Sequence, residues 1–419
     1  MLAHSPTMSD DPPSLLQLTP LNPTFRDDPH AEFARIREHH PLYRDDMAGV
    51  FVLSRFKQIR DVLSDRTMLK GPEKSEPAAL LSKRLIEQME HDPERGEQRF
   101  YSILFMDDPD HARVRGPLAK ALYARAAKCK PLIDAIVHEK LDAVAARGEF
   151  DVLADYSIPV PIDVIGAILG VDIERRGEFR DWSEGAIQIL NPLRTPEQIA
   201  HMERSTHAIA AYIEDLMAAR RAEPRDDLVT DMVRLKAEGA DLQDAEISRN
   251  LIGLLVGGNL TTSDLIGNAT YALLTHPGEL AKLKADPGII NQAVEEVLRF
   301  DPPVEITARI TPRDMEVGGC PMKARQQMIS LLRAANRDPD VFENPDAFDI
   351  SRKPGPHLAF GGGAHICIGA PLARLEAQAA LAKLFQRFPG LRLARPDEAP
   401  PKRTLPFFNG FQRLDVVIA

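Results

Sequence analysis

The sequence predicts a mainly α-helical fold with a small β-rich lobe. Between residues 110 and 300, long Ala- and Leu-rich runs alternate with Pro, Gly and Asp breaks, as in a series of helices. Residues 243–275 form the longest helical candidate, about 50 Å at 1.5 Å per residue. From Pro302 onward, short β-like pieces separated by turns take over.

The two ends of the chain add shorter elements to this plan. Residues 1–20 are expected to be a flexible tail, and residues 21–419 a single domain, because no linker divides them. Hydrophobic periodicity and turn residues place the remaining elements. In chain order these are a helix over residues 27–39, a strand over residues 51–53, a helix over residues 57–64, a helix after residue 367 and a strand over residues 414–418.

The composition is that of a globular chain, with 44% apolar and 27% charged residues. Its formal net charge of −10 argues against a general nucleic-acid binder. The three cysteines, Cys129, Cys320 and Cys367, are too few and too scattered for a disulfide framework, which favours a reducing compartment. No early stretch reaches the length of a membrane span. We therefore expect a cytoplasmic protein without a membrane anchor.

One cysteine closes a glycine-rich loop immediately before a helix. Phe360 begins this loop, Gly361, Gly362 and Gly363 follow it, and Cys367 precedes Gly369 and the helical run. Backbone N–H groups and the helix dipole favour a thiolate at such a place, and a thiolate is the form that binds metals. A lone cysteine is too little for structural zinc but sufficient as the single axial ligand of haem iron. If only the glycines and the cysteine were considered, an ordinary buried cysteine after a turn would be the alternative to a metal ligand.

The full ten-residue pattern resembles the cysteine-loop signature of the cytochrome P-450 family, and the resemblance runs from about residue 20 to the end. It implies the P-450 fold, a triangular prism with a long central helix over the haem. It implies haem b with Cys367 as metal ligand, Phe360 and Gly369 around the sulfur, and His365 at a propionate. The implied activity is an O2-dependent monooxygenase that hydroxylates or epoxidises an apolar small molecule.

Further positions match cofactor contacts of that family. His111 and Arg115 are four residues apart, so they project from one helix face and can hold the same anionic group. Taken alone, this pair favours a solvated basic face. The resemblance implies that both contact haem propionates, and that Arg309 binds a propionate through its guanidinium fork.

The centre of the longest helix is unusual for an element that only packs. Gly257 and Gly258 each cost roughly 1 kcal/mol relative to alanine in a helix interior. The resemblance identifies this segment as the oxygen-binding kink, with Gly258 beside the haem and Thr261 as the alcohol that handles oxygen. Leu260 replaces the usual acid, so we expect Asp264 to supply part of a proton relay, with a capping or solvent-side role as the alternative.

Glu296 and Arg299 have the spacing of a helical ion pair, which is common and weak on a surface. The pair resembles the buried Glu-x-x-Arg of the family. The family often adds a third polar partner where this chain has Ala347, so Asn336 or Arg337 are the open alternatives for that place.

A basic stripe without acids extends from His111 to Ile133 and suits either a solubilising surface or a docking site for an acidic protein. The resemblance favours docking of a [2Fe-2S] ferredoxin, which a ferredoxin reductase supplies with electrons. The residues expected at this site are Arg113, Lys120, Arg125 and Lys128.

The substrate pocket is expected to be apolar, with Val304, Ile306 and Phe407 in its wall. Glu305 and Asn409 are candidates for orienting a polar group of the substrate. Peroxide-driven or non-hydroxylating haem-thiolate chemistry is the alternative that Leu260 favours, and a haem-binding sensor is a further one.

Overall fold

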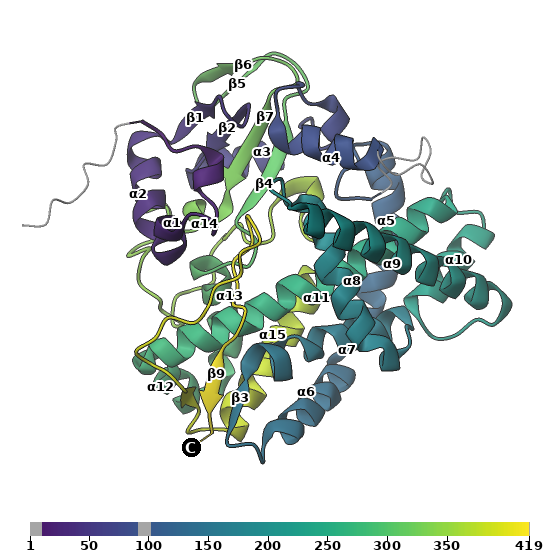
Figure 1. The fold of residues 1–419 in the computed structure, drawn as a ribbon, viewed down its shortest axis with the longest axis vertical. Helices are drawn as coiled ribbons and strands as arrows, with labels where there is room; N and C mark the ends of the chain where they lie inside the picture. Colours follow the sequence, from purple (N-terminus) through teal and green to yellow (C-terminus); the bar gives the residue numbers. More distant parts are fainter. Residues whose placement is uncertain (1–10, 91–101, 419) are drawn as a thin grey trace, which may run out of the picture.

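The computed structural model describes residues 11–90 and 102–418, and in this part it confirms a mainly helical chain with small sheets (Figure 1). The helices are α1 (Pro23–Asp27), α2 (Pro29–His39), α3 (Phe56–Ser64), α4 (Leu80–Glu90), α5 (Asp110–Ala126), α6 (Lys130–Val144), α7 (Pro159–Leu169), α8 (Arg176–Ala186), α9 (Pro196–Ala222), α10 (Leu228–Ala237), α11 (Asp244–Thr275), α12 (Pro277–Ala285), α13 (Ile290–Phe300), α14 (Leu332–Ala335) and α15 (Ala370–Arg387). The strands are β1 (Leu42–Asp45), β2 (Val50–Leu53), β3 (Glu149–Asp151), β4 (Ile306–Ile310), β5 (Met315–Val317), β6 (Cys320–Met322), β7 (Gln327–Leu331), β8 (Arg392–Leu393) and β9 (Asp415–Val417).

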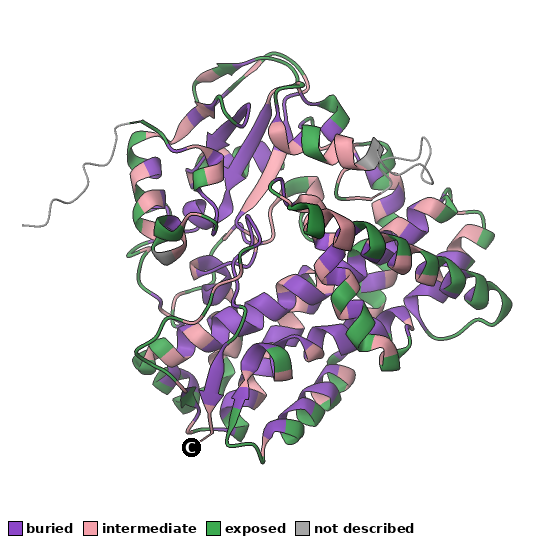
Figure 2. Cartoon of the chain, in the orientation of Figure 1, coloured by how far each residue is buried: buried purple, intermediate pink, exposed green. Residues whose placement is uncertain are grey.

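The long helix predicted over residues 243–275 is α11, and it runs through the middle of the molecule. Helices α7, α9, α13 and α15 pack around it. Figure 2 shows it buried along most of its length. A helix that is apolar nearly all round belongs in the core of a large domain. Its neighbours therefore fix the positions of most of the side chains it carries.

The β-rich lobe is a sheet with strand order β1-β2-β7-β4, shown at the top of Figure 1. Strand β7 is parallel to β2 and antiparallel to β4. Its register pairs Ile306 with Leu331 and Ile310 with Gln327. Side chains alternate between the faces of a strand, so Ile306, Ala308 and Gln327 share one face, and the side chains between them lie on the other.

The amino-terminal segment differs from the flexible tail expected for residues 1–20. Residues 1–10 lie outside the described part, but Leu15 and Leu18 are buried in an apolar cluster with α2 and β2. The Leu15 N–H donates to Asp45 at 2.6 Å, and the Tyr43 hydroxyl donates to the Pro13 carbonyl at 2.8 Å. The sequence missed this packing because two leucines spaced by three residues give no periodic signal.

No helix within residues 11–90 and 102–418 is long and apolar enough to cross a membrane.

Candidate functional site

The loop before α15 holds Cys367 in a fixed conformation. The Cys367 N–H donates to the Phe360 carbonyl at 2.9 Å, which closes the loop on itself. Gly363 has a φ of +67°, and a Cβ there would lie 1.9 Å from the Leu63 carbonyl oxygen, so only glycine fits. Burial raises the pKa of the Cys367 thiol, while the Gly369 N–H and the Arg115 guanidinium favour the thiolate.

A cavity of about 480 Å³ opens in front of this cysteine. Its walls come from α4, α11, β4, the cysteine loop and the segment before β9, so they join parts of the chain that are far apart in sequence. Ten of the residues selected from the sequence line it: Arg115, Gly258, Thr261, Val304, Ile306, Phe360, His365, Cys367, Gly369 and Phe407. The rest of the lining is mostly aliphatic or aromatic.

Basic side chains gather at one end of the cavity. Lys70, Arg115 and His365 line it there. His111 is buried behind His365, with the two ring centroids 4.0 Å apart. Arg309 is also buried and donates to the Gly362 carbonyl at 3.3 Å. The predicted residues His111, Arg115, Arg309 and His365 therefore come together, although His111 and Arg309 do not reach the cavity wall.

The protein itself gives this basic cluster little compensating negative charge. Burial and the nearby Arg309 lower the pKa of Lys70 to about 7, with Asp107 acting in the opposite direction. Burial, followed by His111, lowers the pKa of His365 to about 2. The buried Nε2 of His111 has no hydrogen-bond partner. Basic side chains whose charged forms are disfavoured by burial and by each other suit a flat apolar cofactor that carries carboxylates at one edge, because the carboxylates would supply the missing negative charge.

Sequence reasoning missed Lys70. Its side chain reaches the cluster from the turn before α4, where Nζ donates to the Thr307 hydroxyl at 3.4 Å. The Asp107 carboxylate holds that turn by accepting from the N–H groups of Lys70 and Gly71. No motif marks this lysine, because its position depends on contacts with β4 and with the segment before α5.

The glycine and threonine positions of α11 face the cavity opposite the cysteine loop. Gly257 and Gly258 line the cavity, and a Cβ on Gly257 would meet nothing within 4 Å. The Thr261 hydroxyl donates to the Gly257 carbonyl at 2.8 Å. The helix remains continuous here, so the kink implied by the family resemblance is limited to this hydrogen bond from the Thr261 side chain.

Asp264, the residue expected to supply part of a proton relay, does not line this cavity. Its side chain is fully buried outside the cavity lining, where Arg403 donates to Oδ1 at 3.1 Å and Gly410 packs closely. Burial raises the pKa of Asp264 to about 6. Residues three apart on a helix differ by about 60° in direction, and Leu265, four residues after Thr261, lines the cavity instead. Leu260 is buried and also lies outside the lining.

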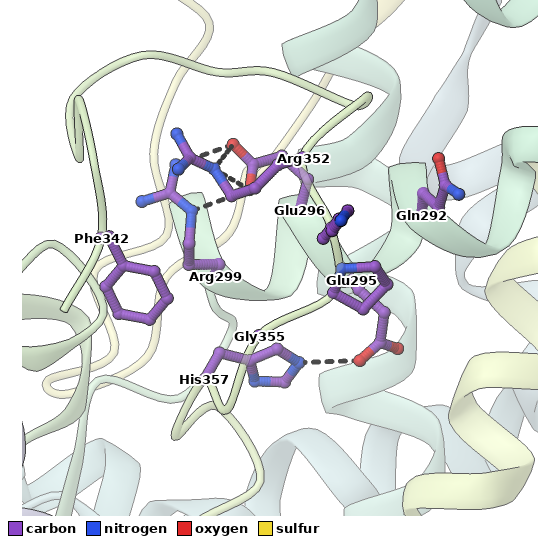
Figure 3. Close-up of a pocket in the computed structure, with 10 residues that line it drawn as sticks. Gln292, Glu295, Glu296, Arg299, Phe342, Arg352, Gly355 and His357 are labelled. Atoms are coloured by element: carbon purple, nitrogen blue, oxygen red, sulfur yellow. Dashed lines mark hydrogen bonds and ion pairs between the residues drawn. The ribbon is translucent and has the colours of Figure 1, made fainter.

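Glu296 and Arg299 form a buried pair away from the cavity, beside a small crevice (Figure 3). Two guanidinium nitrogens of Arg299 each lie 2.7 Å from a Glu296 oxygen. Arg352, which the sequence did not indicate, approaches Glu296 to 3.3 Å. The carbonyl groups that accept from Arg299 belong to Asn336, Pro345 and Ala347. Of the two residues considered as the third partner of this pair, Asn336 contacts it through its backbone carbonyl, whereas Arg337 donates to the Phe300 carbonyl instead.

The basic stripe on α5 is less available than its sequence suggested. Arg113 binds Glu246 at 2.5 Å and Asp110 at 2.9 Å. Arg125 binds Asp231 at 2.6 Å. Lys120 and Lys128 are exposed. Acids from α10 and α11, distant in sequence, therefore occupy the two arginines and leave the lysines as the exposed part of the stripe.

The polar candidates for the substrate pocket have structural partners instead. Glu305 is buried and accepts from Arg333 at 2.7 Å. The Asn409 N–H donates to the Pro303 carbonyl at 2.8 Å. Neither residue lines the cavity. Trp182 packs on Phe179 and does not line the cavity, whose wall nearby is formed by Ile189 and Leu190.

Known proteins share both the sequence and this arrangement. The Cytochrome P450 family model matches residues 288–407, the stretch that holds the Glu296–Arg299 pair and Cys367. Cytochrome P450 107B1 of Saccharopolyspora erythraea is 35% identical over 397 residues, which cover 94% of this chain and 95% of that protein. The chain belongs to the cytochrome P450 family. The 6-deoxyerythronolide B hydroxylase of the same organism is 33% identical over 375 residues, 88% of this P450 and 91% of that enzyme.

The solved structures agree with this assignment. The crystal structure of the myxobacterial cytochrome P450 CYP267B1 in complex with myristic acid matches with a TM-score of 0.86 and 34% identity, over 96% of this chain and 98% of that one. This P450 is accordingly a monooxygenase whose cofactor is haem b. The residues fit that cofactor, because the cavity is apolar around Cys367 and has Lys70, Arg115 and His365 in its wall for the propionates.

Proposed function

We propose that this P450 inserts oxygen into an apolar small organic molecule held between α11 and the cysteine loop, with Cys367 as the thiolate ligand of the haem iron. The supporting observation is that Cys367 and Thr261 line one largely apolar cavity of about 480 Å³. Bound haem supplies the oxygen-activating chemistry. Arg115, His365 and Lys70 would hold its carboxylates, and Phe360 with the cysteine loop would keep water from the sulfur.

The substrate class is tested by optical titration of the haem with apolar compounds. We expect terpenoids, steroids or long-chain compounds of suitable size to displace water from the haem and shift the spin state, since the cavity offers mostly aliphatic contacts. Small charged metabolites of equal size serve as controls and should give no shift. A panel in which only the charged compounds produce the shift would contradict an apolar substrate.

Within this site, Thr261 is the residue that we propose handles protons, and Asp264 has no part in it. Replacement of Asp264 by Asn should leave the ratio of product formed to NADH oxidised unchanged, because the carboxylate faces Arg403 and not the cavity. Replacement of Thr261 by Ala should lower that ratio severalfold, because the alcohol that holds a proton-relaying water is lost. A fall in the ratio for the Asp264→Asn variant would restore the relay role of this aspartate.

The electron donor is proposed to be an acidic [2Fe-2S] ferredoxin, itself reduced by a ferredoxin reductase, that docks on α5 around Lys120 and Lys128. Helix α5 carries Arg115, which lines the haem cavity and donates to the Ile366 carbonyl beside Cys367 at 2.5 Å. A partner on the exposed side of α5 is thus close to the thiolate side of the haem. The exposed lysines supply attraction for an acidic surface.

The docking site is tested by charge reversal at Lys120 and Lys128. The Lys120→Glu, Lys128→Glu double variant should be reduced by ferredoxin roughly tenfold more slowly at low ionic strength, and the difference should shrink as salt is added. The rate is followed in a stopped-flow instrument by formation of the ferrous carbon monoxide complex. Arg313→Glu with Lys323→Glu, at the β5–β6 hairpin away from α5 in Figure 1, makes the same charge change as a control. Equal slowing in both double variants would contradict docking on α5.

Peroxide-driven chemistry is the second candidate. It is favoured because the described lining residues place no carboxyl group on α11 beside Thr261. Among the described lining residues, Glu376 is the one acid, and it lies on α15 rather than on α11 beside Thr261. With Leu260 at the usual acid position, protons have no carboxylate route from α11. Comparing product yield from hydrogen peroxide with the yield from NADH, ferredoxin and O2 separates the two modes. We expect the ferredoxin route to give more product, and the reverse would favour the second candidate.

A further inference from the structure

Gln327 is a buried polar side chain that lines the apolar cavity and has no part in the function proposed for it. It is 4% exposed and lies at the start of β7. Its Nε2 donates to the Ser82 hydroxyl of α4 at 2.8 Å, and both residues line the cavity. The amide oxygen Oε1 is buried without a hydrogen-bond partner. Buried amide oxygens nearly always have partners, so this one is available to a ligand.

The amide is not part of the basic cluster that suits the haem carboxylates. The β4–β7 register places Gln327 on the sheet face of Ile306 and Ala308, and both of these line the cavity. Arg309 belongs to the opposite face, as does Thr307, which contacts Lys70 and also lines the cavity. With the amide in this orientation, a carboxylate has no proton to give Oε1 at neutral pH, so a propionate does not satisfy this acceptor.

The other amide of the described lining residues does not need a ligand. Asn250 accepts from the Ile103 N–H at 2.9 Å and donates to the Glu246 carbonyl at 2.7 Å. Thr261 likewise donates to Gly257. Gln327 therefore stands out in this wall as an amide with one polar atom unused.

We propose that Gln327, with Ser82, binds a hydroxyl group of the substrate, so that this P450 takes apolar alcohols in preference to the matching hydrocarbons. Exchanging the amide oxygen and nitrogen would leave the nitrogen unpartnered instead. A hydroxyl both donates and accepts, so it satisfies the amide in either orientation, whereas a ketone satisfies only one. This inference rests on the proposed apolar substrate and adds one polar group to it.

The test compares two rigid pairs, adamantan-1-ol with adamantane and cyclododecanol with cyclododecane, by spin-state titration of the haem-loaded protein. We expect the ratio of hydrocarbon Kd to alcohol Kd to fall about tenfold in Gln327→Met, because one buried hydrogen bond is lost. Gln326→Met is the matched control, since the neighbouring glutamine lies outside the cavity lining, and its ratio should equal that of the wild type. Gln327→Leu repeats the test with a second apolar side chain.

Three results would overturn the inference. An unchanged ratio in Gln327→Met and Gln327→Leu, with clear shifts in every protein, excludes the hydroxyl contact and leaves the apolar pocket intact. Loss of haem from both variants, with Gln326→Met normally loaded, assigns the amide to the cofactor. Absence of any shift with the wild type contradicts the apolar substrate itself, and both proposals fail together.

Discussion

A Cys367→Ser variant is expected to retain the fold but lose O2-dependent product formation to below detection. Serine has nearly the shape of cysteine, so the loop closed by the N–H of residue 367 and the Phe360 carbonyl persists. Its hydroxyl is far too weak an acid to serve as the anionic ligand whose electron donation favours O–O cleavage. Far-UV circular dichroism monitors folding, and product formation with ferredoxin, its reductase and NADH monitors activity.

The chain contains a matched control for this change. Cys320 lies in the β5–β6 hairpin and does not line the cavity, so Cys320→Ser should keep full activity and an unchanged haem spectrum. Substantial turnover by Cys367→Ser, or a comparable loss in Cys320→Ser, would contradict the assignment of the thiolate to residue 367.

An Arg299→Ala variant is expected to lose about 3–5 kcal/mol of unfolding free energy, the usual result of removing one partner of a buried ion pair. The side chain is 2% exposed. It binds both oxygens of Glu296 and the carbonyls of Asn336, Pro345 and Ala347, so its removal takes the two-pronged partner from a buried carboxylate and the donors from three carbonyl groups, of which that of Asn336 is buried. Urea unfolding of the haem-loaded protein, followed by circular dichroism and by the Soret band, measures the loss.

The neighbouring arginine provides the comparison for this prediction. The Arg352 side chain is 18% exposed and lies farther from Glu296, at 3.3 Å, so Arg352→Ala should cost about 1 kcal/mol. Arg299→Lys should fall between the two, because an ammonium keeps the charge but not the planar fork that reaches carboxylate and carbonyls together. Equal losses in Arg299→Ala and Arg352→Ala would show that charge near Glu296 matters, rather than the geometry of Arg299.

Much of the helical framework could be predicted from the sequence, because it depends on local patterns. The long run over residues 243–275 became α11, and the helices expected near α2 and α3 are present with boundaries within about two residues. The loop around Cys367 was equally visible, since its glycines mark backbone conformations and close approaches that other residues do not allow.

The expectations that these contacts modify concern side chains whose surroundings come from distant parts of the chain. Asp264 is three residues from Thr261, so the two side chains differ by about 60° in direction. Asp264 therefore contacts Arg403 and does not line the cavity. Arg113 and Arg125 were expected on a docking surface, yet acids from other helices bind them. A sequence gives the direction of a side chain along its own helix, but not the element that packs against it.

Residues without a motif were missed for the same reason. Lys70 and Gln327 lie in a turn and at a strand end, and nothing in their immediate sequence distinguishes them from surface residues. They gain a role only when β4, β7 and α4 are brought around one cavity.

The central claim, a sulfur bond from Cys367 to haem iron, is tested most directly by the spectrum of the reduced protein under carbon monoxide. The purified, haem-loaded wild type should show the strongly red-shifted Soret band that a thiolate ligand produces. The same band should be absent from Cys367→Ser and present in Cys320→Ser. A well-folded, haem-loaded wild type whose band lies where neutral histidine ligation places it would contradict the account.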